Sequence, residues 1–161
     1  MDLLWTPWRY RYVSSRSPVE CIFCELLGRP REEDARNLIL SRRSHIYLIL
    51  NRYPYTSGHM MVVLNRHVSD LEHSDPAELK ELIDAAREVE GVLRRTYAPD
   101  GFNIGFNIGK SAGAGVAGHL HLHIVPRWIG DSNFVSVIGE TRMIPEDLSS
   151  AFDRLAPHFQ D

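Results

Sequence analysis

The sequence predicts an α+β fold in which an antiparallel sheet carries one long helix, with short helices toward both ends of the chain. Two observations support this prediction. Short apolar runs of strand length are separated by turn residues, and one long segment, residues 79–97, repeats its apolar positions every three to four residues. The chain has 161 residues, 43% of them hydrophobic and 24% charged. This composition fits a single globular domain over residues 1–161, with residues 1–17 as an N-terminal arm.

Charge and cysteine usage narrow the class of protein. There are 18 Lys and Arg residues against 21 Asp and Glu, a net charge of −3, and such a chain is poorly suited to bind nucleic acid. No apolar stretch approaches the ~18 residues that a membrane span needs. The N-terminus lacks the features of a secretory signal, so we expect a cytoplasmic protein without membrane contact. In a reducing compartment the only two cysteines, Cys21 and Cys24, are expected to bind metal or form a redox pair.

The N-terminal third is expected to contain an arm, a helix and three strands. Aromatic and arginine residues are mixed over 5–12; they could stack on bases, but we favour an arm that covers the core or a partner subunit. Residues 20–27, followed by Gly28, have the length and the terminal glycine of a short helix, which places both cysteines on one face. Runs of Leu, Ile and Tyr predict three strands, the first two joined as a hairpin, over 37–40, 45–50 and 59–64.

The long periodic segment predicts a central helix. Asp75 fits its N-cap, Pro76 its first turn, and Glu78 a return contact to the cap. Steps of three and four residues put seven positions on one helical face: Leu79, Leu82, Ile83, Ala86, Val89, Leu93 and Tyr97.

The last third predicts two more strands and a final helix. Residues 102–108 and 120–125 alternate as strands do, and the glycine-rich loop 109–115 separates them. A final helix after Pro145 carries four apolar residues, Leu148, Ala151, Phe152 and Leu155.

Three histidines alternate with leucines in the run from His119 through His121 to His123. On a strand that rises ~3.3 Å per residue, these imidazoles project to one side, about 7 Å apart, while the leucines face the core. A row of imidazoles suits acid, base, nucleophile or metal-ligand roles rather than core packing. A catalytic metal held by all three is the alternative hypothesis, which the lack of an Asp or Glu in the strand weakens.

The glycine-rich segment 107–118 lies directly before this row. Glycines let the backbone approach a ligand closely and turn successive N–H groups toward an anion. Together, the loop and the row indicate imidazole nitrogens aimed at a phosphorus atom.

These residues resemble the signature of the histidine-triad (HIT) nucleotide-binding proteins. The matching motifs are Cys21-Ile22-Phe23-Cys24, Asn51-Arg52-Tyr53-Pro54, Gly58-His59, and Val125-Pro126-Arg127-Trp128. The resemblance extends from about Cys21 to Trp128 and implies a HIT-like fold. Parts of it are similar to the fragile-histidine-triad branch, which cleaves dinucleoside polyphosphates, and parts to bacterial diadenosine tetraphosphate phosphorylases.

The resemblance implies roles for individual residues. His121 would be the nucleophile that attacks the α-phosphorus, and His123 and His59 would contact phosphate oxygens or the nucleophile. Asn51 matches the ribose contact, because an amide can both donate to and accept from sugar hydroxyls. Further nucleotide-binding positions would be Asn107, Gly113, Ala114, Gly115 and Trp128.

The loop departs from the pattern of hydrolytic relatives, which usually carry Gln and then Ser or Thr before the first histidine. This chain has Ala114 or Gly115 and then Val116, in a loop one residue longer. Backbone N–H groups would replace the missing side-chain donors. The smaller residues also leave room for a second anion, which suits inorganic phosphate as an acceptor in place of water.

The C-x2-C spacing of Cys21 and Cys24 fits either a redox dithiol or a metal site. The resemblance implies two further ligands, His67 and His119. Two thiolates and two imidazoles make a closed tetrahedral set, which favours a structural zinc ion.

Three functions therefore compete. The leading hypothesis is an enzyme that cleaves dinucleoside polyphosphates through a nucleotidyl-histidine, by phosphorolysis or hydrolysis. A weakly catalytic or non-catalytic, zinc-stabilised purine-nucleotide-binding protein is second, and a metallohydrolase is third. The resemblance also implies a homodimer formed around the long helix and a sheet edge.

Overall fold

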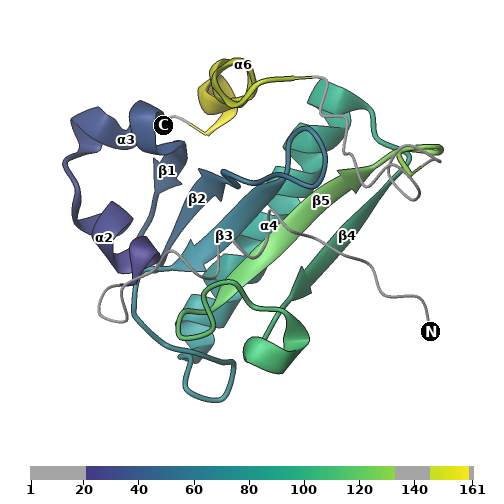
Figure 1. Cartoon of the computed structure of the whole chain (residues 1–161). Coiled ribbons are helices and arrows are strands. Elements are labelled where there is room, and N and C mark those ends of the chain that lie inside the picture. Colours follow the sequence, from purple (N-terminus) through teal and green to yellow (C-terminus); the bar gives the residue numbers. More distant parts are fainter. Residues whose placement is uncertain (1–20, 133–145, 160–161) are drawn as a thin grey trace.

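The computed structural model describes residues 21–132 and 146–159, so the predicted N-terminal arm lies outside the described residues. Five strands form one antiparallel sheet in the order β1-β2-β3-β5-β4 (Figure 1). Their bounds are β1 Ile39–Arg42, β2 Ile46–Leu50, β3 Met60–Leu64, β4 Gly101–Phe106 and β5 His121–Arg127. The predicted α+β class is confirmed, and each predicted strand is present. The first begins two residues later than predicted, at Ile39, because Asn37 still belongs to a short helix.

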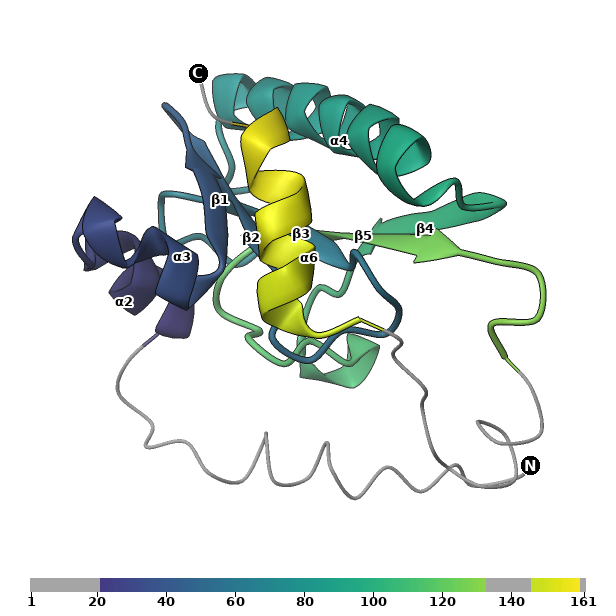
Figure 2. The same ribbon diagram turned by 90° about the horizontal axis from the view of Figure 1, so that it is seen from above.

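The long helix α4, Pro76–Tyr97, covers one face of this sheet and packs against β2, β3 and β5 (Figure 2). The predicted capping box between Asp75 and Glu78 is present. The predicted apolar face is wrong at one position, because Ile83 is 58% exposed. The helix buries Ala85 and Val92 instead, so its contact stripe is rotated away from Ile83.

Two short helices precede the sheet. Helix α2, Ile22–Gly28, begins two residues later than predicted, with Cys21 as its N-cap. Helix α3, Asp34–Asn37, was not predicted, because four residues are too few to show a helical period. Arg42 holds the two together: its guanidinium donates to the Leu27 carbonyl at 2.6 Å and to Asp34 at 2.6 Å.

The final helix α6, Leu148–Leu155, lies where the sequence predicts it and contacts α4. Asp147 caps it by accepting a hydrogen bond from the Ser150 N–H at 3.0 Å. None of the helices in the described part of the chain is both long and apolar enough to cross a membrane.

The register of the sheet decides which side chains share a face. His123 of β5 lies opposite Met61 of β3 and Gly105 of β4, so these three positions point to the same side. Ile124 points the other way and is fully buried beneath α4. The histidines of β5 therefore lie on the face of the sheet that α4 leaves open.

One buried carboxylate allows a test of stability. Glu78 is 4% exposed and accepts hydrogen bonds from Arg66 at 2.8 and 2.9 Å and from the Asp75 N–H at 2.8 Å. The bonds from Arg66 hold the pKa of Glu78 below its usual value of 4.5. We expect Glu78→Gln to cost about 2 kcal/mol of unfolding free energy at pH 7, as loss of a charged hydrogen bond does.

The sign of the pH dependence follows from the lowered pKa. The carboxylate stabilises the fold above the unfolded pKa, and this contribution is lost as pH falls through the lower folded pKa. The unfolding free energies of wild type and variant, measured with urea, should therefore converge as pH falls through the lowered pKa of Glu78. Glu72→Gln, at an exposed position in the loop before α4, is the matched control; an equal loss in that variant would contradict the prediction.

Candidate active site

The three rings of the histidine row lie on the open face of the sheet, as predicted. Phe23 of α2 contacts the ring of His119 at 5.4 Å and that of His121 at 4.9 Å, measured between centroids. The rings of His121 and His123 are 4.9 Å apart. The intervening Leu122 is 2% exposed and belongs to the core. The row thus lies on the face of the sheet opposite α4, where helix α2 and the glycine-rich loop leave His119 and His121 almost fully buried.

The tautomer of His121 is set by the backbone. Its Nδ1 lies 2.8 Å from the carbonyl oxygen of His119, which can only accept, so Nδ1 carries the proton and Nε2 carries the lone pair. Burial lowers the pKa of His121, because desolvation disfavours the imidazolium. A neutral imidazole with a fixed, unprotonated Nε2 is the form that can act as a nucleophile at pH 7.

A second chain of hydrogen bonds orients His123. The Tyr55 N–H donates to His59 Nδ1 at 3.1 Å, which leaves the His59 proton on Nε2. His59 Nε2–H then donates to His123 Nδ1 at 3.0 Å, which places the His123 proton on Nε2. Burial lowers the pKa of His123 to about 4, with a smaller contribution from His121. His123 is thus a neutral hydrogen-bond donor at physiological pH.

A cavity of about 410 Å³ opens beside His121. One end is apolar and is lined by Ile22, Phe23, Leu26, Leu38 and Ile49. The other end contains most of the predicted polar and loop positions, namely Asn51, Asn107, Gly113, Gly115, His121 and His123. Ala114 lies between the two glycines and does not line the cavity. Such a combination of an apolar end and a few polar groups is typical of a small-molecule site.

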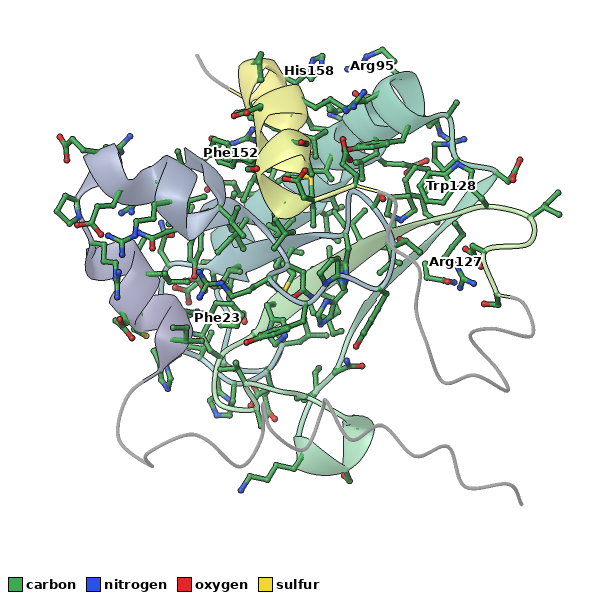
Figure 3. The ribbon with its side chains drawn as sticks, turned by 45° about the horizontal axis from the view of Figure 1, so that its top comes forward. Phe23, Arg95, Arg127, Trp128, Phe152 and His158 are labelled. Carbon is green, nitrogen blue, oxygen red and sulfur yellow. The ribbon has the colours of Figure 1, made fainter. Side chains whose placement is uncertain are left out.

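A larger cavity of about 1180 Å³ lies beyond His123. It shares Tyr55, Asn107 and His123 with the smaller cavity, but His121 does not line it. Trp128 lines the larger cavity, not the one that contains Asn51 and His121. Figure 3 shows this separation, with Phe23 near α2 on one side and Trp128 beyond the end of β5 on the other. Trp128 therefore lies apart from the other positions that were predicted to bind nucleotide.

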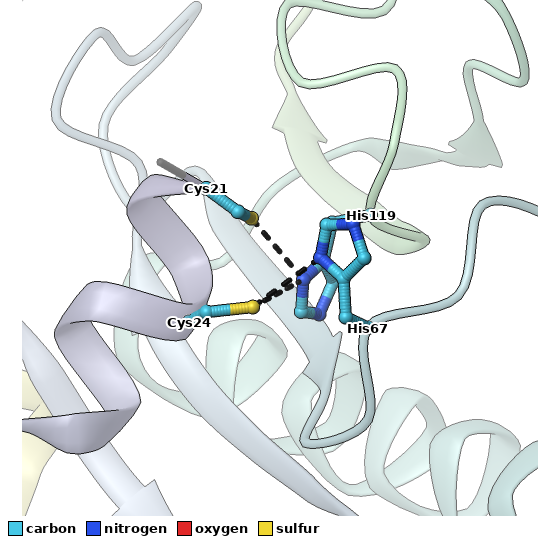
Figure 4. Close-up of side chains that lie close together, drawn as sticks. All are labelled: Cys21, Cys24, His67 and His119. Carbon is cyan, nitrogen blue, oxygen red and sulfur yellow. Dashed lines mark hydrogen bonds between the residues drawn. The ribbon is translucent and has the colours of Figure 1, made fainter. Parts of the chain in front are cut away.

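The two cysteines meet the two predicted histidines at the N-terminus of α2 (Figure 4). Cys21 Sγ lies 3.3 Å from His119 Nδ1, and Cys24 Sγ lies 3.3 Å from His67 Nδ1. All four ligand atoms lie within 4.8 Å of one another. Zinc bonds of about 2.0–2.3 Å in a tetrahedron give ligand separations of about 3.5 Å, so this cluster could hold a metal ion of that size.

A hydrogen bond from the other ring nitrogen of His119 supports its role as a ligand in this cluster. His119 Nε2–H donates to the Leu64 carbonyl at 2.7 Å, which leaves the lone pair of Nδ1 directed at the sulfur atoms. His119 is therefore committed to the cysteines and not to a site shared with His121 and His123. This arrangement argues against the metallohydrolase hypothesis.

Sequence reasoning missed two contributors to the site. The ring of Tyr55 contacts that of His59 with centroids 4.8 Å apart, and its backbone N–H sets the tautomer of His59. Its position four residues before His59 was the only feature of the sequence that could have indicated this contact. Leu38 adopts a left-handed backbone, with φ of 64°, which is rare for a bulky residue and turns it into the smaller cavity. Nothing in the local sequence indicates that conformation.

Comparisons with known proteins show which sequences and structures this chain resembles. The HIT domain family profile matches residues 32–128. The chain is 41% identical over 156 residues to the AP-4-A phosphorylase of Mycobacterium tuberculosis, an alignment that covers 91% of this chain and 78% of that protein. It is 36% identical over 78 residues to the asymmetrical bis(5'-nucleosyl)-tetraphosphatase of Schizosaccharomyces pombe, over 48% of this chain and 42% of that protein. A Zn-bound histidine triad family protein from Mycobacterium smegmatis superposes with a TM-score of 0.68 at 28% identity, over 86% of this chain and 92% of that one.

Proposed function

Since the chain belongs to the HIT domain family, we propose that it cleaves dinucleoside polyphosphates of the diadenosine tetraphosphate type at the α-phosphate, through a covalent nucleotidyl-histidine. Two of its relatives are named as enzymes, an AP-4-A phosphorylase and a bis(5'-nucleosyl)-tetraphosphatase. The single observation that carries the proposal is the fixed Nε2 of His121 at the wall of the smaller cavity. Asn51, at the same polar end, supports a ribose contact.

The bond changes balance without an external acid or base in the first step. The Nε2 lone pair of His121 forms a bond to the α-phosphorus as the bond to the bridging oxygen breaks, and ATP leaves as an anion. The positive charge that develops on the imidazole is stabilised through Nδ1–H and the carbonyl of His119. Phosphate or water then attacks the phosphorus and restores neutral His121.

His123 supports this step as a donor and not as an acid. Its Nε2–H is available to a phosphate oxygen, because Nδ1 already accepts from His59. The low pKa of His123, about 4, means that no imidazolium is present at pH 7 to give up a proton. None is needed, because a polyphosphate leaves as a stable anion. Intact-mass measurement after rapid mixing with diadenosine tetraphosphate should reveal the nucleotidyl adduct; nucleotide binding with no adduct and no turnover would favour the purine-nucleotide-binding alternative.

We also propose which molecule accepts the nucleotidyl group from His121. Gly113 and Gly115 line the smaller cavity with no side chain that reaches it, and Val116 adds only an apolar one. This open loop supports a second anion, inorganic phosphate, beside the nucleotidyl group. We expect diadenosine tetraphosphate to yield ATP and ADP when phosphate is present and ATP and AMP when it is absent. Anion-exchange chromatography separates ADP from AMP and so shows whether phosphate or water is the acceptor. A constant yield of AMP at saturating phosphate would identify a hydrolase.

We further propose that the ion held by Cys21, Cys24, His67 and His119 is zinc. The chemistry of the donor set supports it, since two thiolates with two imidazoles favour zinc over harder cations. A Zn-bound relative has the same fold. Four protein ligands leave no open position, so the ion would join α2 to the sheet and take no part in the reaction.

A homodimer is also proposed, because β4 is an outer strand with β5 as its one neighbour in the sheet. Ile104 of β4 is 45% exposed and points to the side of the sheet that α4 covers, where Ile83 is 58% exposed. Among the described strands the outer edge of β4 has no partner, and such an edge with an exposed apolar side chain is a ready surface for a second copy of the chain.

Light scattering at micromolar concentration should therefore give about twice the single-chain mass of 18.4 kDa. Ile104→Glu is expected to shift the mass to that of one chain, because a carboxylate would be buried without a partner. Leu71→Glu, at another exposed apolar position in the loop before α4, should leave the dimer intact. A wild-type mass near 18.4 kDa would contradict the prediction.

A further inference from the structure

The two cavities on the open face of the sheet meet at His123. The smaller contains the nucleophile His121, and the larger, about 1180 Å³, extends from His123 toward the end of β5. The larger cavity has no role in holding the nucleotidyl group that His121 receives. It is nevertheless the larger of the two and adjoins a reacting centre.

We propose that the larger cavity binds the leaving half of the substrate, a nucleoside 5'-polyphosphate. This inference rests on the proposed function and extends it to the side of the phosphorus that departs. In an in-line displacement the leaving oxygen lies opposite the nucleophile, and His123 lines both cavities while His121 lines only the smaller. A leaving group that moves away from His121 passes His123 and enters the larger cavity.

The lining suits a nucleoside better than a bare chain of phosphates. Its two arginines are already paired, Arg127 with Asp131 at 2.6 Å and Arg154 with Glu146 at 2.9 Å. Asp147 also lines the cavity, so carboxylates outnumber arginines there and the lining offers no net positive charge to a chain of phosphates. The aromatic ring of Trp128 lines the same space and provides a stacking surface for a base. The phosphates would remain near the donors of the shared wall.

A glycine inside strand β4 points to the same conclusion. Gly105 lies opposite His123 and lines the larger cavity, and a Cβ built on it would meet no atom within 4 Å. Its backbone does not require glycine, since its φ lies outside the left-handed range. Glycine weakens a strand interior and often marks the close approach of a ligand. Here it keeps open the space directly beside His123.

Gly105→Val places a side chain in this space, where a Cβ meets no atom within 4 Å, and valine suits a strand. Gly101→Val is the matched control: Gly101 lies on the same strand and the same side, its Cβ would also meet nothing within 4 Å, and it does not line the cavity. Each variant is assayed on diadenosine tetraphosphate and on the 4-nitrophenyl ester of AMP. Both substrates deliver the same nucleotidyl group and a leaving group that departs as an anion, but only the first has a second nucleoside.

The readout is the ratio of kcat/KM for the two substrates. Gly105→Val should lower that ratio at least about tenfold, whereas Gly101→Val should leave it within about twofold of wild type. Trp128→Ala should lower it by a similar amount through lost stacking, with Ile129→Ala, at a 92% exposed neighbour outside the cavity, as its control. Equal losses on both substrates in Gly105→Val and Trp128→Ala would overturn the inference. Failure of wild type to cleave either substrate would instead overturn the proposed function.

Discussion

His121→Ala is expected to lower kcat on diadenosine tetraphosphate by several orders of magnitude, about 10⁴-fold or more. The reason is that a nucleophile acts only in the chemical step, and no neighbouring group replaces it. His123 cannot take over, because its Nδ1 accepts from His59 and its Nε2 carries the proton. The affinity for substrate should change much less, since the apolar end of the smaller cavity is untouched.

The experiment needs a control for folding, because His121 is only 5% exposed. The His121→Ala variant should have the same metal content as the wild type and a melting temperature within a few degrees of it. His73→Ala, at an exposed surface position, is the matched histidine deletion and should retain full activity. Near-native turnover by His121→Ala would show that the assignment of the nucleophile is wrong.

Removal of the supporting histidines should cost less. His123→Ala and His59→Ala are expected to lower kcat by about 10²-fold to 10³-fold, as loss of a donor to a developing charge does. His59 contacts His123 and not the cavity that contains His121, so its effect should be no larger than that of His123→Ala. A larger loss in His59→Ala would mean that it contacts the substrate itself.

Much of this fold follows from local patterns in the chain. Helix α4 is long enough to show its period and carries a capping box, so its start at Pro76 was predictable. The face of α4 that contacts the sheet was not predictable. Ile83 lies close to the buried positions on the helix surface, and it is exposed only because of the angle at which α4 packs on the sheet. Helix α3 is too short to have a pattern.

Some parts of the candidate active site could also be predicted from the sequence, and others could not. The histidine row and the C-x2-C pair are short motifs, and the resemblance to histidine-triad proteins added His67 and His119 to the pair; the structure brings these four residues together. The two cavities could not be predicted, because each is formed by segments far apart in sequence that only the strand order β3-β5-β4 brings together. Trp128 illustrates this: it follows the β5 motif closely in sequence, yet the strand carries it past His123 into the larger cavity.

Loss of the bound ion is expected to lower the free energy of unfolding by several kcal/mol. The four ligands come from the start of α2, the loop after β3 and the residues before β5, and no such site exists in the unfolded chain, so binding energy becomes folding energy. Elemental analysis of protein purified without chelator should give close to one zinc per chain. Chelation should lower the melting temperature, and returned zinc should restore it.

Cys24→Ala separates this effect from general damage by the chelator. The variant should melt at about the temperature of the chelated wild type, and chelator should then change it no further, because the ligand set is already broken. The proposed ion would also fix His119, whose ring contacts Phe23 and whose carbonyl accepts from His121 Nδ1–H. Wild type without zinc, assayed below its melting temperature, should therefore bind nucleotide more weakly, since α2 supplies Ile22, Phe23 and Leu26 to the apolar end of the smaller cavity. Protein without zinc that melts as the wild type does, or a disulfide between Cys21 and Cys24 in freshly reduced protein, would contradict a structural zinc site.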